Sequence, residues 1–223
     1  MQHTDKLISV LRQNSHWKIL DVGGGEQPCL QATDVIDIYL WTPSERQGII
    51  GKTGETGTGA LNFIEHDINN IPWPKKDKEL SAMDDKSYDF VICSNVLEDI
   101  RDPMAVCREM SRVAQRGMIE VPCVLTEINK GVDETYENYG EYPGYYHHRW
   151  FVGFSNNRLE FLAKHMGAIG HSSKMPYKGA FQIWWEGKID AVELIALSRK
   201  DYDVTLRNMI EREESLLGKR VEL

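Results

Sequence analysis

Apolar runs alternate with amphipathic stretches along the chain, and this pattern predicts strands and helices in alternation. Five short apolar runs are expected to be strands, at 17–22, 34–38, 61–67, 88–96 and 117–122. Helical spacing of apolar residues predicts helices over 4–13 and over 104–115, the second beginning after Asp102 and Pro103. Short strands separated by helices or loops indicate βαβ units and a largely parallel sheet.

The second half of the chain has a less regular pattern. Leu159, Phe161 and Leu162 predict a helix over 155–166, and apolar residues at helical spacing predict one long or broken helix over 189–217. Two further strands are expected, at 168–174 and 180–187. The glycine-rich stretch 42–59 and the stretch 123–150 are predicted to be loops.

Length and composition favour one domain over residues 1–223. A cofactor-binding part is expected at about 17–122, a lid or substrate segment at about 123–154, and a C-terminal helix at about 189–217. Hydrophobic residues make up 41% of the chain, which is enough for a sizeable core. The formal net charge of -8 argues against a nucleic-acid partner.

Four cysteines stand in the chain without C-x-x-C spacing, so neither a disulfide framework nor a structural zinc site is expected. No apolar stretch is long enough to cross a bilayer. These features predict a soluble protein of a reducing compartment, the cytoplasm, with no membrane partner.

The stretch WKILDVGGGEQP at 17–28 is an apolar run that ends in three glycines. Such a loop lets a ligand approach bare backbone. Gly23 and Gly25 fit the opening of the dinucleotide fingerprint G-x-G-x-x-G, but Pro28 stands at its third position. Glu26 would place a negative charge where a pyrophosphate must sit, so the stretch favours a cationic cofactor without phosphate.

A second glycine-rich stretch, at 42–59, contains Gly51, Lys52 and Thr53, which match the end of the phosphate-binding P-loop G-x-x-x-x-G-K-[ST]. Arg46 stands where its first glycine is required, and neither the preceding strand nor the following helix is predicted. A surface loop is therefore the preferred interpretation.

Two aspartates follow the glycines in the order that a nucleoside site requires. Asp37 ends the second predicted strand, where an acidic side chain can accept hydrogen bonds from a ribose diol. Asp67 closes the third strand and can accept the exocyclic amine of a purine while Ile68 covers the ring. The alternatives are a turn or helix-cap aspartate at 37 and an Asx turn before Asn69 at 67.

Four successive segments, ILDVGGGEQP, DVIDIY, HDINNIPWP and SYDFVICSNVLEDIRDPMAVCREMSRVAQRGMIEVP, resemble the motifs of class I S-adenosylmethionine-dependent methyltransferases. The resemblance is greatest to the group called methyltransferase type 11, and it covers residues 17–122. It implies an α/β, Rossmann-like, doubly wound seven-stranded sheet, mostly parallel, with helices on both faces. It also implies S-adenosyl-L-methionine as the cofactor.

Carried over position by position, the resemblance implies a set of cofactor-binding residues. They fall into four groups: the methionine end, the ribose, the adenine, and the floor beneath the methyl group. In that order they are Asp21, Gly23, Gly24 and Gly25; Asp37 and Ile38; Asp67 and Ile68; and Ser94, Asn95 and Val96. The chain departs from the family at Glu98-Asp99, where Glu-His is common, so any role of that histidine is absent.

The segment EYPGYYHHRWFVGF supplies the catalytic candidates. His147 or His148 can act as a general base, and Arg149 can bind a carboxylate or phosphate of the substrate. Tyr146 and Glu120 are further candidates for substrate binding. The alternative is that the aromatic residues pack a small core while the histidines are solvated. No metal site is expected, because adjacent histidines in an extended segment point to opposite faces.

These observations predict a methyltransferase that acts on a small-molecule or sugar-like acceptor by in-line displacement. Two alternatives remain: a catalytically silent S-adenosylmethionine-binding protein, and an NAD-dependent oxidoreductase. The apolar residues of the C-terminal helix can also provide a homodimer contact.

Overall fold

The computed structural model describes residues 5–25, 28–38, 62–76, 78–133, 142–165, 168, 171 and 179–216. The chain divides into two compact units. Unit 1 comprises Met1–Ser94, Arg108–Met118 and Glu186–Lys188, and unit 2 comprises Asn95–Cys107, Ile119–Trp185 and Ile189–Leu223.

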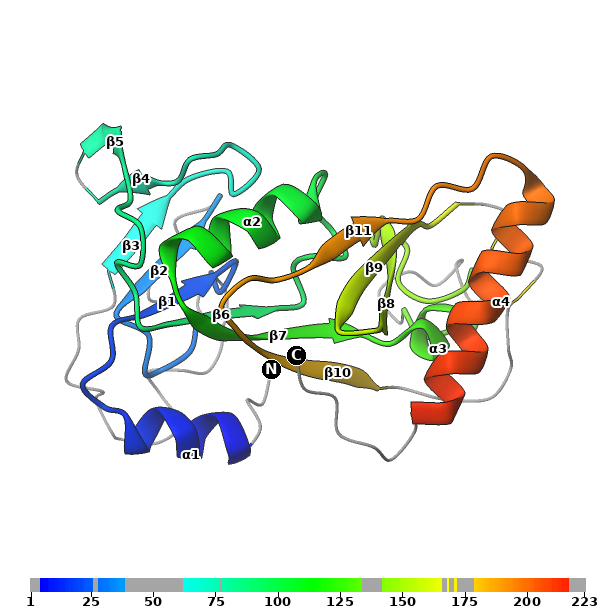
Figure 1. Ribbon diagram of the computed structural model, residues 1–223, viewed down its shortest axis with the longest axis horizontal. Helices are drawn as coiled ribbons and strands as arrows, with labels where there is room; N and C mark the ends of the chain where they lie inside the picture. The colour runs from blue at the N-terminus through cyan, green and yellow to red at the C-terminus, as the bar shows by residue number, and fades with distance from the viewer. Residues whose placement is uncertain are drawn as a thin grey trace. The chain divides into compact units, whose positions relative to one another are not determined.

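Four parallel strands form the centre of unit 1 (Figure 1): β1 (Ile19–Val22), β2 (Asp34–Asp37), β3 (Asn62–Glu65) and β6 (Phe90–Ser94). β1 pairs with β2 and with β6, and β2 pairs with β3. All four residues of β1 are buried, which explains its continuously apolar sequence around Asp21. Because the strands are parallel, their carboxyl ends lie at one edge of the sheet.

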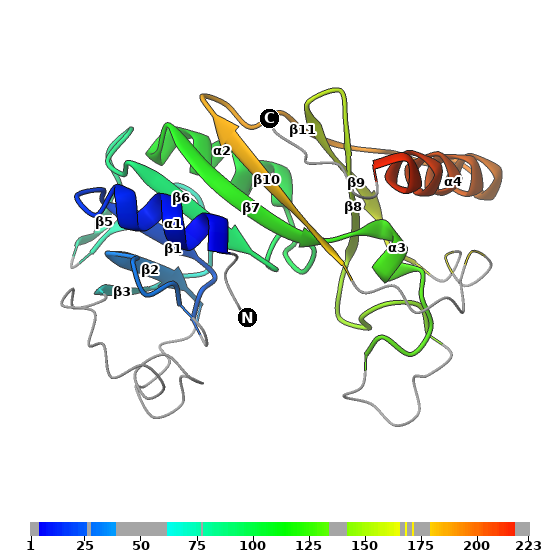
Figure 2. The same cartoon turned by 90° about the horizontal axis from the view of Figure 1, so that it is seen from below.

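Helix α1 (Asp5–Gln13) lies on one face of these strands (Figures 1 and 2), with Leu7 and Leu11 buried. Helix α2 (Pro103–Val113) follows β6 in the chain. Between β3 and β6, the strands β4 (Pro74–Lys75) and β5 (Lys78–Ala82) form a short antiparallel pair. In unit 1, buried Glu109 accepts a hydrogen bond from the backbone N of Trp73 at 2.9 Å. Arg112 bonds both to Glu109 and to the carbonyl oxygen of Met83, so the end of α2 is tied to this hairpin.

The large sheet has the strand order β10-β7-β6-β1-β2-β3, with β7 (Arg116–Pro122) and β10 (Ala180–Glu186) at one side. Gly187 N donates to Gln115 O, and Cys123 N donates to Gly179 O, so β10 runs antiparallel to β7. The predicted α/β class with a mostly parallel sheet is confirmed. In the described part of the chain the sheet has six strands, where seven were expected.

Unit 2 contains a second sheet with the order β11-β9-β8, formed by β8 (Trp150–Ser155), β9 (Arg158–Ala163) and β11 (Ala191–Glu193). Helices α3 (Val124–Glu127) and α4 (Arg199–Leu216) accompany it (Figure 2). They enclose a core of buried apolar side chains: Val124, Ile128, Phe151, Leu162, Ala168, Tyr202, Leu206 and Met209.

The helix predicted over 155–166 is wrong, because this segment is the β8–β9 hairpin. Asn156 and Asn157 form its two-residue loop with φ angles of 51° and 59°, and Ser155 pairs with Arg158. Asparagine tolerates this left-handed conformation, and two such residues form the turn that matches strand twist. The apolar side chains that suggested helical spacing are strand residues.

The helix predicted over 189–217 is also wrong in its first part. Residues Ala191–Glu193 form β11, which pairs in parallel with β9, and the helix begins at Arg199. The strand predicted at 180–187 is confirmed as β10, and the five earlier strands and two earlier helices are found with bounds within two residues of those predicted. The predicted loop 123–150 contains α3, while 42–59 and most of 168–174 lie outside the described residues.

All four cysteines are buried and free. Among the described helices, none combines the length and the apolar character needed to cross a membrane.

Candidate functional site

The glycine loop after β1 is braced by Asp21. This side chain is 2% exposed, and its Oδ2 accepts a hydrogen bond from Cys29 N at 2.7 Å. Burial raises the pKa of Asp21 to about 7, although the hydrogen bond from Cys29 opposes the shift. A Cβ atom on Gly24 would lie 2.3 Å from Oδ2 of Asp21, so only glycine fits over this carboxylate. Asp21 therefore holds the loop from inside.

Asp37 joins the same loop from the end of β2. Its Oδ2 accepts a hydrogen bond from Gly25 N at 2.9 Å, and Gly23 N donates to Ile36 O at 2.8 Å. Ile38, the next residue, is 66% exposed. A carboxylate, an apolar side chain and bare glycine backbone thus meet at the carboxyl edge of β1 and β2, which fits a cofactor with a ribose diol and a cationic end.

Asp67 forms an Asx turn, which the sequence analysis gave as the alternative to an adenine contact. Its Oδ1 accepts hydrogen bonds from the backbone N and the side-chain Nδ2 of Asn69, both at 2.9 Å. The carbonyl oxygen of Ile68 accepts from Trp73 Nε1 at 3.0 Å, and the Ile68 side chain is 7% exposed. The roles of Asp67 and Ile68 at an adenine stay predictions.

The three residues expected to form the floor of the cofactor site fall in different units. Ser94 is the last residue of β6 in unit 1 and is half-buried, whereas Asn95 and Val96 belong to unit 2. Asn95 has a φ angle of 52°, and its backbone N donates to Glu120 O at 2.8 Å. Their cofactor contacts also stay predictions, and Glu26 lies outside the described residues.

A pocket of about 420 Å³ lies within unit 2 and is called here the histidine pocket. Both predicted catalytic histidines line it, together with side chains from several distant segments. The lining residues are Asn95, Asp99, Pro122, Thr126, Tyr145, His147, His148, Gly179 and Ala180.

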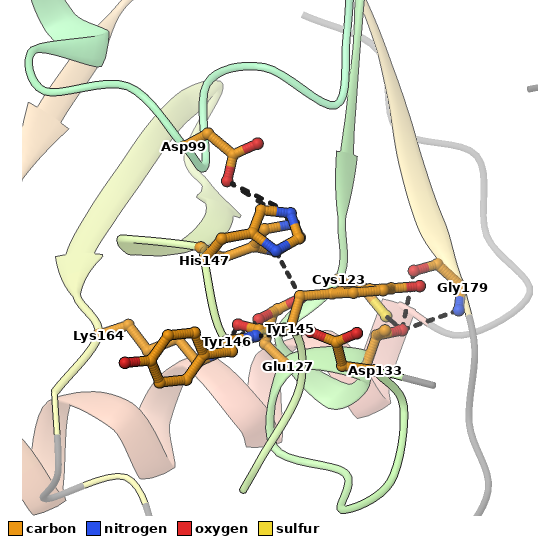
Figure 3. A network of polar contacts seen from close by, with 11 residues as sticks. Asp99, Cys123, Glu127, Asp133, Tyr145, Tyr146, His147, Lys164 and Gly179 are labelled. Atoms are coloured by element: carbon orange, nitrogen blue, oxygen red, sulfur yellow. Dashed lines mark hydrogen bonds and ion pairs between the residues drawn. The ribbon is translucent and has the colours of Figure 1, made fainter. Parts of the chain in front are cut away.

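Glu127, at the end of α3, organises this pocket from below (Figure 3). Its side chain is fully buried; Oε1 lies 2.9 Å from His148 Nδ1, and Oε2 accepts from Lys164 Nζ at 2.5 Å. Lys164 is 1% exposed and also donates to Tyr145 O at 2.8 Å. Burial lowers the pKa of Lys164, and the charge of Glu127 opposes the shift. The ammonium therefore compensates the buried carboxylate.

Gly144 lets the histidine-bearing segment pass close to Glu127. It has a φ angle of 63°, and a Cβ atom there would lie 2.7 Å from the Cα of Glu127. Its N donates to Asn129 O at 2.7 Å, and Lys130 bridges to Pro143 next to it. This close approach brings the ring of His148 to Oε1 of Glu127.

Asp99 faces both histidines. Its Oδ1 lies 3.9 Å from His147 Nε2 and 3.8 Å from His148 Nε2 (Figure 3). Burial raises the pKa of Asp99, and the two imidazoles oppose that shift. The argument against a metal site assumed an extended segment, and that assumption is wrong. His147 lies in a turn and His148 directly follows it, so both rings approach one carboxylate oxygen.

Glu98, next to Asp99, is fully buried, and burial raises the pKa of its carboxyl well above the usual range. Neither of its carboxylate oxygens has a hydrogen-bond partner among the described residues. Its backbone oxygen accepts from Arg149 N at 2.7 Å and from Trp150 N at 3.1 Å. These two hydrogen bonds link the turn at residues 98–99 to the start of β8.

The remaining substrate candidates do not line the histidine pocket. Glu120 accepts from Gln182 Nε2 at 2.6 Å, Tyr146 is 50% exposed with its N donating to Asp133 Oδ2 at 3.2 Å, and Arg149 is exposed. Their roles at a substrate stay predictions.

Three residues of the pocket network, Asp99, Glu127 and Lys164, were not predicted as site residues. A signal existed for Asp99, because it stands where the family often has a histidine. No motif marks Glu127 or Lys164.

Comparison with known proteins gives a family match in the first part of the chain. Residues 20–119 match the family model described as "Methyltransferase domain". No curated protein matches the chain. The matched region contains the braced glycine loop, Asp37, Asp67 and the end of β6.

Solved structures that resemble the chain include the [4+2]-cyclase SpnF, with 18% identity, a TM-score of 0.38, and coverage of 53% of this chain and 45% of that one. A putative sarcosine dimethylglycine methyltransferase from Galdieria sulphuraria has 17% identity, a TM-score of 0.38, and coverage of 59% and 48%. The N-terminal domain of EvdMO1 with SAH bound has 12% identity, a TM-score of 0.39, and coverage of 92% and 69%. This chain therefore spans about half the length of the first two structures.

The parallel sheet and the glycine loop with its two aspartates define a nucleoside-cofactor domain of the Rossmann-like class. The family match is more specific: residues 20–119 match a methyltransferase domain, which supports a class I methyltransferase with S-adenosyl-L-methionine as its cofactor.

Proposed function

We propose that the protein transfers a methyl group from S-adenosyl-L-methionine to a hydroxyl of a small, sugar-like acceptor. The observation that carries the hydroxyl assignment is His148, which is held by a buried carboxylate on one side of its ring and lines the histidine pocket. The methyltransferase domain at 20–119 supports the transferred group.

When bound, S-adenosyl-L-methionine supplies a methyl group on a positively charged sulfur that is an excellent leaving group. The chain's own residues must then align the nucleophile, exclude water and remove any proton that the nucleophile carries. An alcohol holds its proton far above neutral pH, so it needs an activating group, whereas an unprotonated amine does not. A pocket built around an oriented imidazole therefore favours a hydroxyl acceptor.

The contact with Glu127 determines which nitrogen of His148 is available. A carboxylate can only accept hydrogen bonds, so Nδ1 of His148 donates to it and carries the ring hydrogen of the neutral imidazole. The lone pair is then on Nε2, which is the nitrogen that faces Asp99. We assign activation of the acceptor hydroxyl to this lone pair.

The pocket's size and lining support a metabolite-sized acceptor. A volume of about 420 Å³ is within the range of small-molecule sites, which is roughly 300–1,000 Å³. Asn95 and Thr126 add polar groups to its wall. The net charge of -8 agrees with an acceptor other than nucleic acid.

A turnover assay tests the proposal. The protein is incubated with S-adenosylmethionine and a panel of hydroxylated metabolites, and formation of S-adenosylhomocysteine is followed. We expect turnover with at least one member and a fall in kcat of about 100-fold or more in His148→Ala, the range for loss of an acid–base group. The matched control is His171→Ala, since His171 also contacts a carboxylate, that of Asp203 at 3.0 Å, outside the pocket.

Equal turnover by His148→Ala and the parent would remove His148 from the reaction. Binding of S-adenosylhomocysteine without turnover on any acceptor would favour the silent cofactor-binding protein. The homodimer contact through the C-terminal helix and the cytoplasmic location stay predictions.

A further inference from the structure

We propose that Asp99, His147 and His148 bind one divalent transition-metal ion in the histidine pocket. The role of that ion in activating a hydroxyl rests on the proposed function, whereas the binding site itself does not. All three side chains belong to unit 2 and line the same pocket.

The spacing of the three side chains suits a metal. One ligand atom from each residue can be chosen so that all three lie within 4.8 Å of one another. Bonds of about 2.0–2.2 Å to a tetrahedral ion place neighbouring ligand atoms about 3.4 Å apart. The distances of 3.8 and 3.9 Å from Asp99 Oδ1 to the two Nε2 atoms are thus about half an ångström too wide. The side chain of His147 is 59% exposed, so its ring can turn inward.

A second observation is the unsatisfied oxygen that faces the imidazoles. Oδ1 of Asp99 is buried and has no hydrogen-bond partner among the described residues. At 3.8 and 3.9 Å, neither imidazole is close enough to donate to it. A buried carboxylate oxygen without a donor is costly, and a cation between it and the two nitrogens would satisfy all three atoms.

Glu127 supplies the outer-shell partner that metal-binding histidines have. A ligating histidine donates its other ring N–H to a carboxylate or a carbonyl, which fixes the ring and directs the lone pair at the metal. Glu127 Oε1 does this for His148 Nδ1 at 2.9 Å, and Lys164 holds the other oxygen of Glu127. An arrangement that only filled space would not require the buried ion pair.

The ligand set indicates which ion binds. Two imidazoles and one carboxylate suit Zn²⁺ and its transition-metal neighbours better than Mg²⁺ or Ca²⁺, which prefer oxygen ligands. Three protein ligands leave positions open to the pocket, as in catalytic rather than structural sites. A bound ion would occupy the Nε2 lone pair of His148 and would take over the activation that we assigned to this lone pair. It would lower the pKa of a hydroxyl bound at an open position, and the proton would leave to solvent.

The test uses Co²⁺ as a visible probe of a zinc-type site. The full-length protein is freed of metal with a chelator, dialysed, and titrated with CoCl₂ while the visible absorption is recorded; ZnCl₂ is then added. We expect about one Co²⁺ per chain, with absorption bands that Zn²⁺ abolishes. Asp99→Asn and His147→Gln should weaken binding by more than about 100-fold, the upper end of the cost of losing an outer-shell partner. His171→Ala should bind as the parent does.

Absence of Co²⁺ absorption, or equal affinity in the parent and both pocket variants, would overturn the site. Circular dichroism shows that each variant is folded, and exposed His147 gives a substitution that leaves the core untouched. The titration contains neither cofactor nor acceptor, so it can succeed even if methyl transfer fails. Methyl transfer at an unchanged rate by the metal-free protein would overturn the metal's role and leave the proposed function intact.

Discussion

Asp21 and Asp37, the two aspartates near the glycine loop, show that the surroundings of a residue in the fold determine its role. The sequence order of strand, glycines and acid predicted both Asp21 and Asp37 at the site. In the structure Asp21 is buried and bonded to Cys29 N, whereas Asp37 bonds to Gly25 N at the end of β2. Position in the chain could predict that both are near the loop. Only the fold shows that Asp21 supports the loop from inside.

Gly24 provides a prediction at this scale. In Gly24→Ala the new Cβ would collide with the Asp21 carboxylate, which is fastened to Cys29 N. We expect a loss of about 1–3 kcal/mol in the free energy of unfolding, typical of overpacking, and affinity for S-adenosylhomocysteine at least about tenfold weaker. Urea unfolding and calorimetric titration measure the two effects.

The control for this change is Gly187→Asn. Gly187 has a positive φ angle that asparagine tolerates, and a Cβ there meets nothing within 4 Å. Its affinity for S-adenosylhomocysteine should equal that of the parent. Parent-like stability and affinity in Gly24→Ala would show that the loop has room which the structure does not give it.

In the histidine pocket, the sequence could predict the two histidines but not the residues that contact them. His147 and His148 stand out in the sequence because they are adjacent and lie among aromatic residues. Their partners come from elsewhere: Glu127 is 21 positions from His148, and Lys164 is 37 positions from Glu127. An ion pair between residues so far apart follows from the packing of α3 against the strands of unit 2, which no local pattern records.

At the scale of elements, burial on both faces gave β1, β2, β6 and β7 their continuous apolar runs, which made these strands predictable. Turn chemistry explains the wrong prediction in the second half. Leu159, Phe161 and Leu162 can fit a helix or a strand, since three apolar residues in four positions satisfy either period. The deciding signal was the pair Asn156-Asn157, whose positive φ angles form the hairpin. Similarly, β11 forms only because β9 is there to pair with it.

Helix α3 depends on another element for its own formation. Four residues are too few for a stable helix, and its N-cap residue, Cys123, makes no side-chain capping bond. Glu213 of α4 takes that role, with its two carboxylate oxygens accepting from Val124 N at 2.8 Å and Leu125 N at 2.6 Å. Burial nevertheless raises the pKa of Glu213 to about 7, since it outweighs the two hydrogen bonds.

This raised pKa predicts a pH dependence of stability. Between the ordinary value of 4.5 and about 7, the folded protein keeps a proton on Glu213 that the unfolded chain has lost. Raising the pH through this window therefore lowers the free energy of unfolding, by roughly 3 kcal/mol at about 1.4 kcal/mol per pH unit. Glu213→Gln removes the ionisable group, so its stability should fall less than the parent's between pH 5 and pH 7.

Urea unfolding at pH 5, 6 and 7, followed by circular dichroism, measures this difference. Glu214→Gln is the matched control, because Glu214 is the exposed neighbour on the same helix and should leave the parent's slope unchanged. A slope in Glu213→Gln equal to that of the parent would mean that Glu213 ionises normally in the folded protein.

At the scale of the whole molecule, the structure of unit 1, where the cofactor motifs lie, was predicted better than that of unit 2. The strands of unit 1 and the order of their motifs were readable because one ligand requires a glycine loop and acids at successive strand ends. Unit 2 carries no such repeated requirement, and its three-stranded sheet and short helix were not predicted. The sequence therefore identified the domain that binds the cofactor and only the most conspicuous residues of the pocket.

The most direct test of the account is calorimetric titration of the protein with S-adenosylhomocysteine and, separately, with NADH. We expect S-adenosylhomocysteine to bind and NADH not to bind. In Asp37→Asn, which keeps the shape but loses the charge of the side chain that bonds to Gly25 N, affinity should fall at least about tenfold. Binding of NADH without binding of S-adenosylhomocysteine, or equal affinity in Asp37→Asn and the parent, would contradict the account.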